Sequence, residues 1–168
     1  MTESRHTHRS TVSYIDKSRE FYSASGYDKP YQWAANDDAP FTPLSKPLSE
    51  SKVGLVTTSY FLPDDFEYRV PSDMPRVPAV AGRDELAQLN NQYLSWAKDE
   101  THTDDLGSFL PLAQMDRAAQ EGRIGSVSER VYCLPTQYSH RQTQRRDAPR
   151  LIEWMKEDGI DVAVMVPL

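Results

Sequence analysis

The chain has 168 residues, 19 basic and 25 acidic side chains, a formal net charge of −6 and 38% hydrophobic residues. A chain of this length usually forms one domain and can bury a core. The acidic balance argues against nucleic acid as a partner, because nucleic-acid binding needs a basic surface. No apolar run reaches the roughly 20 residues of a membrane helix. The polar N-terminus does not match a secretory signal, and a single Cys excludes a disulfide framework. We therefore expect a cytoplasmic protein that does not bind a membrane.

The first part of the chain combines a tail, a helix and a long loop. Residues 1–10 are polar, and we expect a flexible tail there. Apolar residues recur at helical spacing over 14–25, with Ser13 as a candidate N-cap and Gly26 where a helix ends in a left-handed residue. Pro and aromatic residues are scattered through 27–52 in an order that fits no regular element. We predict a long loop there, of a length that compact domains usually reserve for function.

The middle of the chain predicts two strands separated by two helices. The β-branched run at 52–58 is typical of a buried strand. A second long connection, rich in Pro, follows over 60–83. Apolar spacing predicts a helix over 84–98 and a short helix over 114–120. A further apolar run predicts a strand over 130–134.

The last part of the chain has the clearest pattern. We predict a helix over 148–158, with Asp147 as its cap and Pro149 in its first turn, and a strand over 161–166. The strand is nearly all apolar, which is typical of a parallel strand covered on both faces. The sequence therefore predicts one α/β domain over 11–168, a mostly parallel sheet flanked by helices, with long Pro- and aromatic-rich loops. An exposed edge strand of such a sheet can be buried in a homodimer.

Several motifs of the chain resemble those of one enzyme family. The two most distinctive are Pro-Leu-Ser-Lys-Pro-Leu-Ser-Glu-Ser-Lys at 43–52 and Glu-Gly-Arg-Ile-Gly-Ser at 121–126. Shorter motifs accompany them: Arg-Glu-Phe-Tyr at 19–22, Gly-Tyr at 26–27, Pro-Tyr-Gln-Trp at 30–33, Asn-Asp-Asp-Ala-Pro at 36–40 and Glu-Asp-Gly-Ile-Asp at 157–161. Together they resemble the selenoprotein B family of glycine, sarcosine, betaine and D-proline reductases, over most of residues 14–168.

The resemblance implies a reductase subunit that cleaves a C–N bond of a small amino acid or amine. In such proteins a selenolate or thiolate attacks the carbon next to a carboxylate, because a soft nucleophile of low pKa can displace an amine. In the family the selenocysteine, or the Cys that replaces it, follows a strand that ends much like 164–168. The expected redox residue would therefore come directly after Leu168. The resemblance also implies partner proteins of pyruvoyl type and thioredoxin type, while no cofactor and no metal are expected.

Two accounts of this end of the chain stay open. The reading frame was closed at a UGA codon that the cell translates as selenocysteine, in which case the domain is incomplete at its C-terminus. Alternatively, the chain is a short relative that has lost the redox residue, and it acts as a non-catalytic accessory or scaffolding subunit. An enzyme repurposed for another small molecule is a third reading. A flavin or nicotinamide enzyme is not expected, because no Gly-x-Gly-x-x-Gly turn follows a predicted strand.

Three residues are the candidates for catalysis. Cys133 is the only Cys of the chain, and its apolar strand favours an inert core residue as the alternative. His102 and Asp104 match loosely a His that the family shows shortly before an Asp. Such a pair can act as a general acid or hold a substrate carboxylate, and a solvated loop is the alternative.

Lys46, Ser49 and Thr57 are the candidates for substrate binding. A Lys in a rigid loop between two Pro residues can hold a substrate carboxylate. The alternative is that Pro43 and Pro47 fix the path of the loop while the Lys46 side chain is solvated. Ser49 follows in the same motif, and Thr57 lies in the strand predicted over 52–58.

Overall fold

The computed structural model describes residues 13–27, 29, 37–38, 42–69, 76–94, 99–100, 102–136 and 139–168. Contacts divide the chain into two units, Met1–Phe41 and Thr42–Leu168, and each is described here by itself. The tail predicted at 1–10 and the Pro-Tyr-Gln-Trp motif at 30–33 lie outside the described residues.

The first unit contains helix α1 (Tyr14–Ala24), which confirms the helix predicted there. Ser13 caps it, since its hydroxyl accepts a hydrogen bond from the backbone N–H of Asp16 at 3.3 Å. Gly26 follows the helix with a φ of 85°, a conformation that residues with a Cβ rarely adopt. No side chain of α1 is buried, and the aromatic rings of Phe21 and Tyr22 contact each other edge to face.

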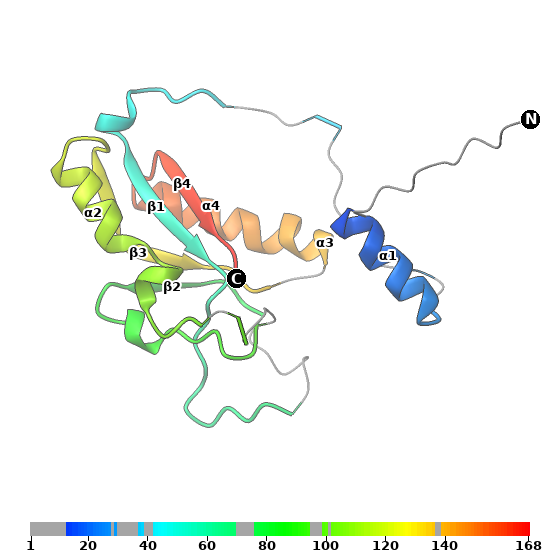
Figure 1. Ribbon diagram of the computed structural model, residues 1–168. Coiled ribbons are helices and arrows are strands. Elements are labelled where there is room, and N and C mark those ends of the chain that lie inside the picture. Colours follow the sequence, from blue (N-terminus) through cyan, green and yellow to red (C-terminus); the bar gives the residue numbers. More distant parts are fainter. Residues whose placement is uncertain are drawn as a thin grey trace, which may run out of the picture. The chain divides into compact units, whose positions relative to one another are not determined.

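The second unit is an α/β fold around a four-stranded sheet in the order β2-β3-β1-β4 (Figure 1). The strands are β1 (Lys52–Thr57), β2 (Ala79–Gly82), β3 (Ser126–Cys133) and β4 (Val162–Val166). β1 runs parallel to both of its neighbours, β3 and β4, whereas β2 runs antiparallel to β3. The prediction of a mostly parallel sheet flanked by helices is confirmed.

Helices α2 (Leu112–Gln120) and α4 (Ala148–Glu157) pack on opposite faces of the sheet. Side chains alternate between the faces of a strand, and β1 shows this directly. Leu55 belongs to a core that it shares with α2, whereas Val56 packs in a second core with Leu151 of α4. β1 is therefore buried from both sides, which explains its continuous apolar sequence.

The connections of the sheet change direction at β1. The chain passes from β1 to β3 by way of the edge strand β2 and then α2, and it passes from β3 back past β1 to β4 through α4. The two crossovers move in opposite directions along the sheet, and their helices lie on opposite faces. The carboxyl ends of β1 and β4 thereby form a topological switch point, which is where open α/β sheets leave a crevice for ligands.

The motif that precedes β1 anchors the amino edge of the sheet. It forms the 3₁₀ turn η1 (Leu48–Glu50), and the hydroxyl of Ser51 donates to the carbonyl oxygen of Pro47 at 2.9 Å. The ammonium of Lys52 donates to the carbonyl oxygen of Asp158 at 2.9 Å, just before β4. The residues of this motif thus hold β1 and β4 together at their start.

The Glu-Gly-Arg-Ile-Gly-Ser motif at 121–126 has a steric explanation. Gly122 has a φ of 71° and ends α2 in the left-handed conformation. Gly125 approaches the backbone before β1 so closely that a Cβ would lie 2.6 Å from the carbonyl carbon of Glu50. Its N–H donates to the carbonyl oxygen of Ser51 at 3.0 Å. Only glycine allows this contact between the segments that start β1 and β3.

The last helix begins earlier than predicted. Ser139 caps α3 (His140–Gln142), and the helix continues through a π-helical segment, Thr143–Asp147, into α4. The prediction that Asp147 caps the helix is wrong, because Asp147 has helical backbone angles inside it. Pro149 explains the π segment: it has no N–H to donate, and its ring crowds the carbonyl four residues earlier, so the helix widens there.

Two further predictions for the middle of the chain are wrong. Residues 60–83 were expected to be a loop, but they include β2. The described part of 84–98 is not the expected helix: it contains the 3₁₀ turn η3 (Leu86–Gln88), after which Asn90 pairs with Tyr60 in an antiparallel bridge. This long-range pairing uses backbone groups that a helix would need.

β4 is covered on one face rather than on both. Val162, Val164 and Val166 pack partly buried against the core on the α2 side. Ala163 and Met165 are exposed on the other face, Met165 with 59% of its surface. Within the described ranges, no helix has both the length and the apolar character needed to cross a membrane.

Candidate functional site

The carboxyl edge of the sheet brings the ends of β1 and β4 together. The backbone N–H of Leu168 donates to the hydroxyl oxygen of Thr58 at 2.8 Å. That hydroxyl in turn donates to the carbonyl oxygen of Leu168 at 3.4 Å. The end of β4 is therefore fixed beside the turn that follows β1, at the switch point of the fold.

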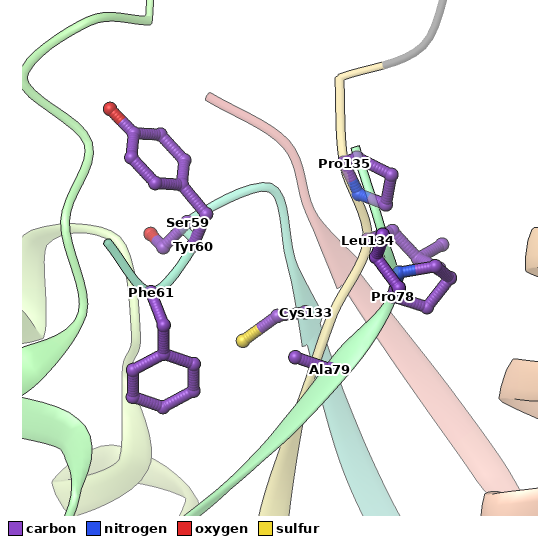
Figure 2. Close-up of a pocket in the computed structure, with 9 residues that line it drawn as sticks. Ser59, Tyr60, Phe61, Pro78, Ala79, Cys133, Leu134 and Pro135 are labelled. Atoms are coloured by element: carbon purple, nitrogen blue, oxygen red, sulfur yellow. The ribbon is translucent and has the colours of Figure 1, made fainter. Parts of the chain in front are cut away.

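A cavity of about 230 Å³ lies at the same edge (Figure 2). Its walls come from the turn after β1, from the start of β2 and from the end of β3, at residues 59–61, 77–79 and 133–135. Six of these nine side chains are Phe, Val, Pro, Ala or Leu, and none is charged. The cavity is thus an apolar recess next to the switch point.

Hydrogen bonds at the end of β1 set the first wall of the cavity. The hydroxyl oxygen of Thr57 accepts from the backbone N–H of Ser59 at 3.2 Å, and the Thr57 hydroxyl donates to the hydroxyl oxygen of Ser59 at 3.2 Å. Both residues are almost fully buried. Thr57 therefore positions the turn that carries Ser59 rather than offering its own hydroxyl to a ligand.

Tyr60 continues this wall and is fixed by the aromatic residues behind it. Its hydroxyl oxygen accepts from the backbone N–H of Tyr93 at 3.1 Å. The ring of Tyr93 stacks on Tyr68, with centroids 4.4 Å apart and planes 8° from parallel. Burial is the main reason that the pKa of Tyr60 is raised, so its hydroxyl stays protonated at neutral pH.

Cys133 lines the cavity but is a poor nucleophile. Its sulfur points into the recess between Phe61 and Ala79 (Figure 2). Burial raises the pKa of the Cys133 thiol to about 12. The thiol is therefore protonated at neutral pH, and the thiolate is the form that acts as a nucleophile. This environment favours the inert core residue over the catalytic one.

His102 and Asp104 lie on a loop at the same edge, outside the cavity. Their Nδ1 and Oδ2 atoms are 3.6 Å apart, and their side chains are 73% and 92% exposed. The hydroxyl of Thr103, between them, donates to the side-chain oxygen of Asn91 at 2.9 Å. Asn91 follows the residue that pairs with Tyr60, so this loop is tied to the wall of the cavity.

Lys46 and Ser49 are not brought to this edge. The ammonium of Lys46 lies 2.7 Å from a carboxylate oxygen of Asp161, just before β4, and Ser49 lies in η1, just before β1. The six residues of β1 separate this amino edge from Thr57 by about 17–20 Å. The six candidates therefore divide: Cys133, Thr57 and the His102 loop lie at the carboxyl edge, and Lys46 and Ser49 lie at the other.

The opposite wall of the cavity is attached to the last helix. The guanidinium of Arg146 donates to a carboxylate oxygen of Asp147 and to the carbonyl oxygen of Arg76, each at 2.6 Å. Arg76 directly precedes the wall at 77–79. Asp147 is 2% exposed, and its second carboxylate oxygen has no hydrogen-bond partner.

Sequence reasoning missed the residues that form most of the cavity. Ser59, Tyr60 and Phe61 directly follow the strand predicted over 52–58, and residues after a parallel strand are the ones that face a ligand crevice. That position was the available signal. The start of β2 gave no such signal, because β2 was not expected. Among the described residues, no three His, Cys, Asp or Glu side chains gather closely enough to hold a metal ion.

Comparison of the chain with protein-family models, curated proteins and solved structures found no match. The resemblance to the selenoprotein B family therefore rests on the motifs themselves. The fold gives two of those motifs a structural role at the amino edge of the sheet.

Proposed function

We propose that the chain provides the sheet and the substrate crevice of a reductase subunit of the selenoprotein B type. Such a subunit cleaves a C–N bond of an amino acid or amine by selenolate or thiolate attack. The observation that carries the proposal is the position of Leu168, which hydrogen-bonds Thr58, the residue before the cavity-lining Ser59. The resemblance places the redox residue directly after Leu168, so its selenium or sulfur atom would stand at the mouth of the crevice.

The proposal assigns the attack to that residue and not to Cys133. The attacking group must be ionised near neutral pH, and burial raises the pKa of Cys133 to about 12. In the attack, a C–Se or C–S bond forms while the C–N bond breaks, and the electron pair leaves with the amine, which takes up a proton. A thioredoxin-type dithiol then supplies the two electrons that release the reduced product and restore the nucleophile.

His102 is the candidate for the proton donor in this scheme. It is exposed at the carboxyl edge with Asp104 beside it, 3.6 Å away. Thr57 acts in the scheme as a positioning residue for Ser59, whereas Lys46 pairs with Asp161 at the amino edge, where Ser49 lies in η1.

The decisive experiment reads the bases that follow codon 168 and labels the protein with radioactive selenite in its own host. The proposal expects an in-frame UGA codon, or a Cys codon, followed by an open frame. With UGA, selenium is expected in a product longer than this chain. A different stop codon, with no selenium in the protein, would refute the assignment of the nucleophile.

The second candidate function is a non-catalytic accessory or scaffolding subunit. The observation that favours it is that the only Cys of the 168 residues is buried and protonated. Such a subunit would keep the sheet and bind the pyruvoyl-type or thioredoxin-type partner without turnover. Co-purification with such a partner, together with an absence of D-proline, glycine or betaine reduction when a dithiol is supplied, would support this alternative.

A further inference from the structure

We propose that the cavity at the carboxyl edge holds a hydrocarbon group, so that its ligand is an amine or amino acid with an apolar side chain or ring of about four to six carbon atoms. As a statement about binding, the inference stands on the cavity alone. As a statement about the substrate, it rests on the proposed function.

The chemistry of the walls carries the first step. Phe61, Pro78 and Leu134 present carbon to the cavity, and no acidic or basic side chain lines it. A charged group inside would lose its hydration without gaining a partner, which is strongly unfavourable. A zwitterion such as glycine therefore has nothing to bind within these walls.

The hydroxyl groups in the walls already have hydrogen-bond partners within the protein. The hydroxyl oxygen of Ser59 accepts from the Thr57 hydroxyl, and the hydroxyl oxygen of Tyr60 accepts from the backbone N–H of Tyr93. The thiol of Cys133 is a weak hydrogen-bonding group. The recess thus favours a group that needs no hydrogen-bond partner, such as a hydrocarbon chain or ring.

The volume sets the size of that group. An apolar cavity of about 150 Å³ is known to hold a benzene molecule, and the present one measures about 230 Å³. A six-membered ring with one or two further atoms fits this space. Each methylene that is buried strengthens binding by about fourfold, so affinity should rise with hydrocarbon size until the cavity is full.

The position of the cavity sets the place of the charged end. Ser59 forms part of the wall, and its neighbour Thr58 is hydrogen-bonded to Leu168. Because the walls offer no charged partner, the ammonium or carboxylate of the ligand stays outside them. The reacting carbon next to the amine would then lie at the switch point, where the proposed nucleophile follows Leu168.

The test measures binding of a series of probes to the full chain by NMR and calorimetry: ethylamine, butylamine, cyclopentylamine and cyclohexylamine, with glycine and betaine for comparison. We expect affinity to rise by about fourfold per added carbon, and glycine and betaine not to bind in the cavity. Bound cyclohexylamine should also slow the reaction of Cys133 with a small neutral thiol reagent, which reports on occupancy of the cavity itself.

Two variants fill the cavity, and one serves as a matched control. Ala79→Leu places extra carbon inside the recess, and Val77→Trp covers it from an exposed position on the rim. Each should weaken cyclohexylamine binding at least about tenfold, since several methylene contacts are lost. Ala163→Leu, on the exposed face of β4, should leave binding within about twofold of the wild type.

An affinity that does not depend on hydrocarbon size, or that both filling variants leave unchanged, would overturn the inference. These outcomes are separate from those of the proposed function, because binding needs no nucleophile. Size-dependent binding together with an ordinary stop codon after Leu168 would support the inference about the cavity and refute the proposed reductase function. A selenocysteine codon without size-dependent binding would support the reductase function, refute the inference about the cavity and indicate a polar substrate.

Discussion

Replacing Asp158 should destabilise the protein mainly because the buried hydroxyl of Tyr132 would lose its hydrogen-bond acceptor. Asp158 follows α4, and its carboxylate accepts from the hydroxyl of Tyr132 at 2.5 Å and from two guanidinium nitrogens of Arg130 at 2.8 Å each. Tyr132 is fully buried, whereas the Arg130 side chain is 31% exposed. In Asp158→Ala the tyrosine hydroxyl loses its main acceptor and keeps only a weak contact with Ser128 at 3.4 Å.

The magnitude follows from these environments. A buried hydroxyl left without its partner costs about 1–3 kcal/mol. Arg130 can turn to water, so its lost pair adds less than about 1 kcal/mol. We expect Asp158→Ala to lower the free energy of unfolding by about 2–3 kcal/mol. Tyr132→Phe removes the donor itself and leaves Asp158 paired with Arg130, so it should cost about 1 kcal/mol.

Urea unfolding followed by tryptophan fluorescence measures both changes. Glu157→Ala is the control, because Glu157 is 60% exposed and lies 3.5 Å from the same guanidinium, and it should cost less than about 0.5 kcal/mol. In Tyr132→Phe, the further change Asp158→Ala should cost clearly less than it does in the wild type. If Asp158→Ala costs no more than Glu157→Ala, the reasoning about the buried hydroxyl is wrong.

The same carboxylate predicts the direction of the pH dependence. Burial by itself raises the pKa of Asp158, but hydrogen bonds from Arg130 and Tyr132 and the charge of Lys52 outweigh it, and the pKa is lowered. The folded protein therefore binds this proton less readily than the unfolded chain does. The stabilisation is complete above the unfolded pKa of about 3.9 and is lost as the pH falls through the folded value. Asp158→Asn should show a shallower loss of stability in this acid range.

Three further predictions concern the amino edge and the thiol. Gly125→Ala should destabilise the fold by more than about 3 kcal/mol in urea unfolding or prevent it, since the added Cβ meets the Glu50 backbone at 2.6 Å; a wild-type midpoint would show that this backbone can shift at little cost. Cys133 should react with iodoacetamide far more slowly in the native protein than in urea, because burial raises its pKa to about 12, and equal rates by mass spectrometry would contradict this. Lys46→Met should raise the pKa of Asp161, which its ammonium now lowers, as followed by carboxyl carbon shifts in NMR. The same variant should bind cyclohexylamine like the wild type, and loss of binding would place Lys46 at the ligand.

The elements that the sequence predicts well are those with a complete local signal. The strands at 52–58 and 161–166 are short apolar runs, and the helix at 14–25 carries its own cap and terminal Gly. β2 was missed because its four residues become a strand only by pairing with β3. The helix expected over 84–98 fails for the same physical reason, since the pairing of Asn90 outweighs a helical spacing of apolar residues.

The sequence predicts that the site lies at the carboxyl edge of the sheet, but it does not predict which side chains form it. The rule for parallel strands points to the residues after β1, and the cavity does lie there. Lys46 is a candidate from sequence because Pro43 and Pro47 on either side indicate a rigid loop, in which a Lys can hold a substrate carboxylate. A rigid loop can lie at either edge of the sheet, so its rigidity does not predict its position. The ionic partner of Lys46 is Asp161, which lies far along the chain.

The close backbone contact at Gly125 has a consequence for how this protein can change. One rim of the sheet includes a close main-chain contact that only glycine allows, whereas the recess at the other rim is lined by side chains on connecting segments. New specificities would therefore arise by exchanging amino acids at 59–61 or 77–79 while the first rim is kept unaltered. A library randomised at the recess should yield many folded clones, and one randomised around Gly125 should yield few.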